Sequence, residues 1–245
     1  MHTNKNIAII IGVLFLIAAI ASIAGLLLYG PVLNNPEYIL NGSQNSRISW
    51  GAVLEIITAF AVMGTAIALY PVLKNYNERL ALAAVGFRLA EGVVIIIGIL
   101  CLLTIVTLNQ DAGKALDSNL PAYLIAGKLL VTFHNWTFLY GPNVLLGPST
   151  LMTAYVLYKT KLVPRAVSTL GLIGGPLIFL CGVLVTLGLF NQISIWGTLL
   201  AIPVFAYEMS LAIWLVSKGF IQPKAVSMPV NNLYKLAGGI SKGVA

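Results

Sequence analysis

Residues 50–73 read WGAVLEIITAFAVMGTAIALYPVL, and this apolar run decides the fold class. A helix of about 20 apolar residues is long enough to cross about 30 Å of hydrocarbon, and the run exceeds that length. A transmembrane β-barrel would instead show short segments that alternate between apolar and polar residues. The stretch therefore predicts a membrane-spanning helix.

Five further runs of this kind predict an all-α, polytopic transmembrane helical bundle with six spans. The predicted spans are Ile7–Tyr29, Trp50–Leu73, Leu80–Leu108, Trp136–Tyr158, Thr169–Phe190 and Ile195–Phe220. We expect Gly30-Pro31 to stop the first span. As one straight helix, Pro121 to Tyr158 would measure about 57 Å, which is too long for a single crossing. We therefore expect an additional outer-side helix over Ala122–Asn135, lying on or projecting from the membrane surface before span 4.

The composition agrees with a membrane protein and argues against a nucleic-acid partner. Of the 245 residues, 59% are hydrophobic and only 9% are charged. A soluble domain of this size needs more charged residues to cover its surface. The net charge of +7 comes from residues scattered over short loops and the tail rather than from a binding patch. Membrane lipids are the predicted partners, and the oligomeric state stays open.

Basic residues predict the orientation, because cytoplasmic loops carry an excess of Lys and Arg. Ten of the 14 fall on the side of the two termini, namely Lys5, Lys74, Arg79, Lys159, Lys161, Arg165, Lys218, Lys224, Lys235 and Lys242. Trp50, Trp136 and Trp196 then lie at the outer interface, where aromatic residues are enriched. We expect one transmembrane domain over residues 1–220 of a cell (plasma) membrane protein, both termini cytoplasmic, and a disordered cytoplasmic tail over residues 221–245.

Four ionisable residues fall inside the predicted spans: Glu55, Arg88, Glu91 and Glu208. A charge at the bilayer centre costs at least about 2.5–3.5 kcal/mol, so each needs a partner, a cavity or a proton. Arg88 and Glu91 are three residues apart and can pair on one helical face. Glu55 and Glu208 have no such partner within their own helices.

The depths of these residues point to a shared polar cavity that opens to the outer side. Glu55 lies about 8 Å below the level of Trp50, and Glu208 about 18 Å below the level of Trp196. Further polar candidates near them are His134, Asn135, Asn143 and Tyr207. In the alternative reading the carboxyl groups are structural, with Arg88–Glu91 as a buried clamp and the other two protonated. Both readings stay open.

Several catalytic and cofactor signatures are missing from the chain. We find no Gly-rich phosphate loop, no paired His or Cys metal motif and no Gly-x-Ser-x-Gly elbow, and we predict no cofactor and no metal. A carboxylate metal site from Glu55, Glu91, Glu208 and His134 is an alternative. The two cysteines, Cys101 and Cys181, lie in apolar runs and are expected to be buried thiols.

Ordered motifs along the chain resemble one known family. They are LYGP at 28–31, GAVLE at 51–55, ALYPVL at 68–73, FRLAE at 87–91, WTFLYGP at 136–142, LVPR at 162–165, EM at 208–209 with Trp214, and KGF at 218–220. The chain is similar to the prokaryotic multi-pass membrane family known as domain of unknown function 4386. That resemblance implies no assigned biochemical role. The family pattern includes Glu55, Arg88, Glu91 and Glu208, and often an acid where this chain has Asn135, which weakens a catalytic or metal role there.

These observations favour a non-enzymatic membrane protein that binds or moves a small, cationic or amphiphilic molecule. Glu55 and Glu208 would provide charge or accept protons in the outward-facing cavity, while Arg88–Glu91 sets their ionisation. One rival is an integral membrane enzyme that acts on an outer-leaflet lipid with a Glu as general base, although no nucleophile stands out. Another is a structural subunit of a membrane complex, which predicts no cavity. Enzymatic activity therefore stays open.

Overall fold

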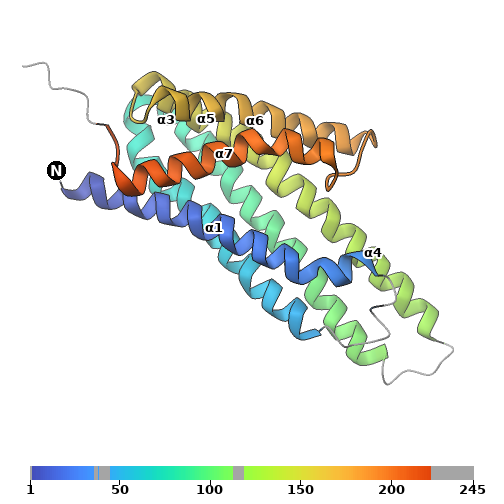
Figure 1. Cartoon of the computed structure of the whole chain (residues 1–245). Coiled ribbons are helices and arrows are strands. Elements are labelled where there is room, and N and C mark those ends of the chain that lie inside the picture. The colour runs from blue at the N-terminus through green and yellow to red at the C-terminus, as the bar shows by residue number, and fades with distance from the viewer. Residues whose placement is uncertain (1, 36–37, 39–44, 113–118, 222–245) are drawn as a thin grey trace, which may run out of the picture.

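The computed structural model describes residues 2–35, 38, 45–112 and 119–221, and every regular element in them is helical (Figure 1). The elements are α1 (His2–Asn34), α3 (Asn45–Ala112), α4 (Leu120–Leu139), the π-helix η2 (Tyr140–Leu145), α5 (Leu146–Thr160), α6 (Arg165–Thr186) and α7 (Ile195–Ser217). The predicted all-α fold is confirmed. The predicted tail falls almost wholly outside the described residues.

Helix α3 is a hairpin of two helical arms that meet at Asn77. The backbone of Asn77 leaves the helix, with φ −157° and ψ 95°. Its side-chain Oδ1 accepts a hydrogen bond of 3.1 Å from the backbone N–H of Leu80, which caps the second arm. At the other end, Nδ2 of Asn45 donates to Oδ1 of Asn109 at 3.3 Å, so the beginning and end of α3 lie together. Figure 1 shows the two arms running side by side.

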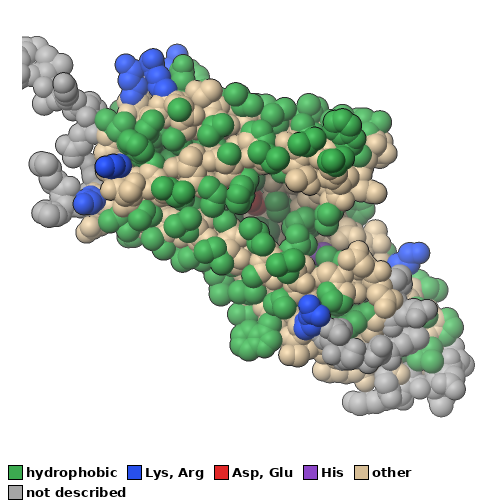
Figure 2. All heavy atoms as spheres, in the orientation of Figure 1, with side chains coloured by type: hydrophobic (Ala, Val, Ile, Leu, Met, Phe, Trp, Pro, Cys, Tyr) green, Lys and Arg blue, Asp and Glu red, His purple; other side chains and the backbone are tan. Residues whose placement is uncertain are grey.

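Four of the described helices are long and apolar enough to cross a membrane: α1 from Lys5, α3, α6 and α7. Only 28–39% of the residues in their most apolar windows are buried inside the molecule. Many of the remaining apolar side chains lie on the surface, and Figure 2 shows hydrophobic side chains spread along the helices of the visible face. A surface of this kind suits lipid rather than water, so the chain is a membrane protein.

Two apolar cores hold the helices together at opposite ends of the α3 hairpin. The first surrounds the α3 turn and packs Leu157 of α5 against Leu211 and Leu215 of α7. The second lies near the ends of α3 and packs Tyr29 of α1 against Leu102. Figure 1 shows α6 and α7 running together on one side, while α1, α3 and α4 extend past them. The polar side chains discussed below lie between these two cores.

Helix α6 approaches both of its neighbours closely because it carries glycines at the contact points. A Cβ atom on Gly174 would lie 2.6 Å from the backbone nitrogen of Val204 in α7. A Cβ atom on Gly175 would lie 2.8 Å from the carbonyl oxygen of Gly147, near the start of α5. Small residues allow helix backbones to approach in this way in membranes. The α5–α6–α7 packing therefore depends on these glycines.

Some predicted boundaries differ from the structure. The first helix does not stop at Gly30-Pro31 but continues to Asn34. A proline in the last turn removes only one helical hydrogen bond, and the side-chain amide of Asn34 donates to the Gly30 carbonyl at 2.8 Å. The loop expected over residues 74–79 is helical except at Asn77. Residues 122–135, the expected outer-side helix, lie in α4, which continues through η2 into α5.

Candidate functional site

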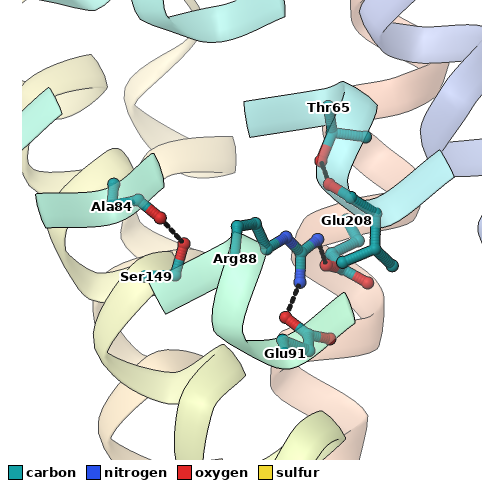
Figure 3. A network of polar contacts seen from close by, with 7 residues as sticks. Thr65, Ala84, Arg88, Glu91, Ser149 and Glu208 are labelled. Carbon is teal, nitrogen blue, oxygen red and sulfur yellow. Dashed lines mark hydrogen bonds and ion pairs between the residues drawn. The ribbon is translucent and has the colours of Figure 1, made fainter. Parts of the chain in front are cut away.

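A buried arginine joins two carboxylates at the centre of the molecule (Figure 3). Nη1 of Arg88 donates to Oε2 of Glu91 at 2.9 Å, and Nη2 donates to Oε1 of Glu208 at 2.6 Å. Arg88 and Glu91 lie one turn apart on the second arm of α3, whereas Glu208 comes from α7. The predicted Arg88–Glu91 pair is therefore present, and Glu208 is a second partner that the sequence did not indicate.

The members of this cluster differ in how far they are buried. The side chains of Arg88 and Glu91 are only 7% and 4% exposed, whereas that of Glu208 is 19% exposed. The Arg88 guanidinium also lies 5.6 Å from the centre of the Phe15 ring, which brings α1 into the site. One formal positive charge thus faces two formal negative charges. If both carboxyl groups are ionised, the cluster carries an excess negative charge.

A small cavity lies beside the cluster. Its lining includes Phe15, Thr65, Arg88, Thr153, Tyr207 and Glu208. Counted as the space open to the centre of a water molecule, its volume is about 20 Å³, which is room for about one water. A larger ligand would not fit in this conformation. Glu91 is absent from the lining, so Glu208 is the carboxylate that meets the cavity.

Some hydroxyl groups around the cavity are hydrogen-bonded, and one is not. The Thr65 hydroxyl donates to the Val62 carbonyl at 2.6 Å, and the Ser149 hydroxyl donates to the Ala84 carbonyl at 2.9 Å (Figure 3). The hydroxyl of Tyr207, by contrast, is buried with no hydrogen-bond partner among the described residues. Leaving a buried hydroxyl unpaired costs about 1–3 kcal/mol, so this group is available to a water or ligand.

Glu55 belongs to a second cluster, contributed by α1, α3 and α4. Its side chain lies on the first arm of α3, is buried, and interacts with the hydroxyl of Tyr29. A second cavity, of about 10 Å³ by the same measure, is lined by Glu55, Gly98, His134 and Thr137 among others. Nδ1 of His134 lies 3.2 Å from the Gly98 carbonyl oxygen. Since a carbonyl only accepts, Nδ1 carries the proton and Nε2 is a free acceptor in neutral His134.

The two clusters are separate, although the sequence had suggested one shared cavity. Glu55 lies ten residues before Thr65 on the same arm of α3, which corresponds to about 15 Å along the helix. Between these levels the side chain of Met63 packs against Gly92 of the other arm, where a Cβ would lie only 2.5 Å from Cγ of Met63. Met63 thus helps to fill the space between the arms at this level.

The remaining predicted residues lie in different surroundings. Tyr207 lines the Arg88 cavity and His134 the Glu55 cavity. Asn143 is buried in η2, where its side chain donates to Sγ of Cys181 at 3.5 Å and accepts from Gln192 at 3.2 Å, which ties η2 to α6. Asn135 is exposed on α4 and joins neither cluster.

The predicted buried thiols are present: Cys101 and Cys181 are both buried, and neither forms a disulfide. Across the described part of the chain, no three His, Cys, Asp or Glu side chains are grouped so that they could hold a metal ion. Tyr29 was not selected from the sequence as a site residue, although it lies in the LYGP motif at 28–31.

Comparison with known proteins assigns the chain to a family. The family model described as Domain of unknown function (DUF4386) matches residues 10–219, nearly all of the described helices. The chain belongs to the DUF4386 family. The predicted resemblance is thereby confirmed, and both clusters of this DUF4386 chain lie inside the matched region. No curated protein and no solved structure matches the chain.

Proposed function

We propose that this DUF4386 protein binds a proton at the Arg88–Glu91–Glu208 cluster and couples it to the movement of a small cationic or amphiphilic molecule across the membrane. The observation that supports this is the sharing of one guanidinium between two carboxylates from different helices, one buried and one partly exposed. In surroundings of low polarity, two carboxylates close together do not both stay ionised without a second cation. The cluster therefore has a place for one exchangeable proton.

Glu208 is the member best placed to exchange that proton. It is the more exposed of the two carboxylates and the one that lines the cavity. Glu91 is nearly enclosed and lies one helical turn from Arg88, so its contact with the guanidinium is maintained by the helix itself. A water in the cavity would give Glu208 a route for the proton. The proton site is thus Glu208, with Arg88 and Glu91 as its electrostatic surroundings.

Protonation of Glu208 would loosen the connection between α3 and α7. The ion pair between Arg88 and Glu208 joins residues 120 positions apart. When Glu208 is neutral, Arg88 keeps Glu91 as its partner and the attraction to α7 weakens. Because the present cavity holds only about one water, binding of an organic molecule requires the helices to separate there. Proton uptake and cavity opening are thereby linked.

The same proposal includes the topology of six spans in the cell membrane with both termini in the cytoplasm. The two arms of α3 supply two crossings, because the turn at Asn77 carries exposed Lys74 and Arg79. Helix α5 with η2 and the end of α4 supplies a fourth crossing, and the start of α4 extends beyond the outer surface. Helices α1, α6 and α7 supply the others. The distribution of Lys and Arg supports this orientation.

The test uses inverted membrane vesicles that hold a proton gradient reported by a pH-sensitive dye. A panel of organic cations and amphiphilic amines is added to vesicles with the wild-type protein and with Glu208→Gln. We expect at least one compound to dissipate the gradient with the wild type and not with Glu208→Gln. Glu78→Gln, on the exposed turn of α3, is the matched control and should behave as the wild type. Equal responses of Glu208→Gln and wild type would contradict the proposal.

A further inference from the structure

Glu55 is a buried carboxyl group without a cation. Glu55 is only 7% exposed. Among the described residues, no Lys, Arg or His lies within ion-pair distance of Glu55. The buried Arg88 contacts Glu91 and Glu208 instead. A carboxylate in apolar surroundings without a partner is strongly disfavoured. The site is therefore incomplete unless it takes up a proton or another cation.

The groups around Glu55 are the right kind for a small cation. Tyr29 of α1 brings its fully buried hydroxyl close to Glu55, and Glu55 is the group with which this hydroxyl interacts. From α4, His134 brings a free acceptor nitrogen to the cavity and Thr137 a hydroxyl. Tyr29 and His134 are the titratable groups that the neighbouring helices bring to Glu55. Together these side chains offer lone pairs, one negative charge and no positive charge.

We propose that Glu55, Tyr29 and His134 form a binding site for one small monovalent cation, either a proton or a metal ion of sodium size, separate from the Arg88 cluster. The cavity of about 10 Å³ has room for an occupant no larger than one water. Organic cations are therefore excluded at this site. A single carboxylate also cannot balance the two positive charges of Ca²⁺ in surroundings of low polarity. The inference does not depend on the proposed transport function.

The location of the site suggests what the cation does. The ring of Tyr29 packs closely on Gly51, where an added Cβ would lie 2.5 Å from the ring. The same ring meets the imidazole of His134 edge-on, with 5.7 Å between their centres. The site therefore joins α1, α3 and α4 at the end of the bundle away from the α3 turn. A bound cation would hold these three helices together.

Infrared difference spectroscopy of the full-length protein in lipid tests the proton. The pH is raised from mildly acidic to mildly basic while the C=O band of protonated carboxyl groups is recorded. We expect Glu55→Gln to remove one component of this band and Glu208→Gln to leave that component in place. Glu78→Gln, which changes an exposed residue of the same helix, is the control. It should keep the band component that Glu55→Gln removes.

Thermal unfolding with sodium chloride or choline chloride at equal ionic strength tests the metal ion. If sodium is the occupant, it should raise the Tm of the wild type by roughly 2–4 °C, as expected for about 1 kcal/mol in a protein of this size. The shift should vanish in Glu55→Gln and persist in Glu208→Gln and Glu78→Gln. Loss of the Glu55 band component without a sodium shift identifies the proton, and a sodium shift that needs Glu55 identifies the metal ion.

The proposal is wrong if Glu55→Gln changes neither the infrared band nor the sodium shift. Should Glu55→Gln fail to fold, Tyr29→Phe decides with the same two measurements, since it removes only the hydroxyl that faces Glu55. We expect Tyr29→Phe to move the Glu55 band component to another pH or to shrink the sodium shift. An unchanged result with Tyr29→Phe would then overturn the site. The Glu208→Gln variant is measured in parallel, so failure of the Glu55 site can be told apart from failure of the proposed transport function.

Discussion

At the scale of single residues, Arg88 is the charge on which the centre of the molecule depends. It is nearly enclosed and has carboxylate partners on both α3 and α7. The cost of burying an arginine made it conspicuous in the sequence, and the spacing of three residues indicated Glu91 as its partner. The contact with Glu208 could not be predicted in this way, because helical spacing carries no information about residues 120 positions apart.

Removing Arg88 should cost more than removing the whole cluster. Arg88→Met leaves the buried Glu91 and the partly exposed Glu208 without their cation, which we expect to lower the free energy of unfolding by about 3–5 kcal/mol. The triple change Arg88→Met, Glu91→Gln, Glu208→Gln removes all the charges of the cluster. It should lower the free energy of unfolding by less than Arg88→Met alone. Unfolding in mixed detergent micelles measures both, with the exposed Arg79→Met as a control expected within about 0.5 kcal/mol of the wild type. A triple variant less stable than Arg88→Met would refute the cluster.

At the scale of elements, the sequence predicted where helices exist better than where they end. Apolar runs reveal a membrane helix because lipid offers no partner for an unpaired backbone group. Pro31 did not end α1, since a proline near a helix end disturbs little. Residues 74–79 were expected to form a loop, whereas one non-helical residue, Asn77, whose side chain caps the second arm, is enough to reverse the chain.

The glycines of α6 provide a test of helix packing. Gly174→Ala places a methyl group 2.6 Å from the backbone of Val204, so one helix must shift, and overpacking of this kind typically costs about 1–3 kcal/mol. Gly86→Ala is the matched control, because nothing lies within 4 Å of its added Cβ. Alanine there should stabilise the helix by up to about 1 kcal/mol. The same unfolding assay compares the two, and equal stabilities would mean that α6 and α7 are not packed this closely.

At the scale of the whole molecule, the fold class and the membrane setting followed from the sequence, whereas the arrangement of the site did not. The carboxyl groups of Glu55 and Glu208 were identified by their cost in lipid. Their depths alone suggested one cavity, because a depth measured along a helix says nothing about which helices are neighbours. The packing of Met63 against Gly92 lies between their levels, and each has its own small cavity.

The proposed orientation predicts which side of the membrane the α3 turn faces. Cysteine introduced at Glu78, an exposed residue of the turn, should react with an impermeant thiol reagent only after cells are opened. Cysteine introduced at Gln110, an exposed residue at the other end of α3, should react in intact cells. The native Cys101 and Cys181 are buried and serve as the unlabelled background. Labelling of Glu78→Cys from outside intact cells would show that the orientation is inverted.

The ion pair between Arg88 and Glu208 also bears on how the chain is made. Synthesis proceeds from the N-terminus, so the α3 hairpin enters the bilayer long before the ribosome reaches α7. During that interval Glu91 is the neighbour that balances Arg88, and the two together carry no net charge. Arrival of Glu208 then gives Arg88 its second carboxyl partner and ties the last helix to the nascent bundle. A chain truncated before α7 would thus keep a neutral hairpin that is already inserted, while its bundle stays unclosed.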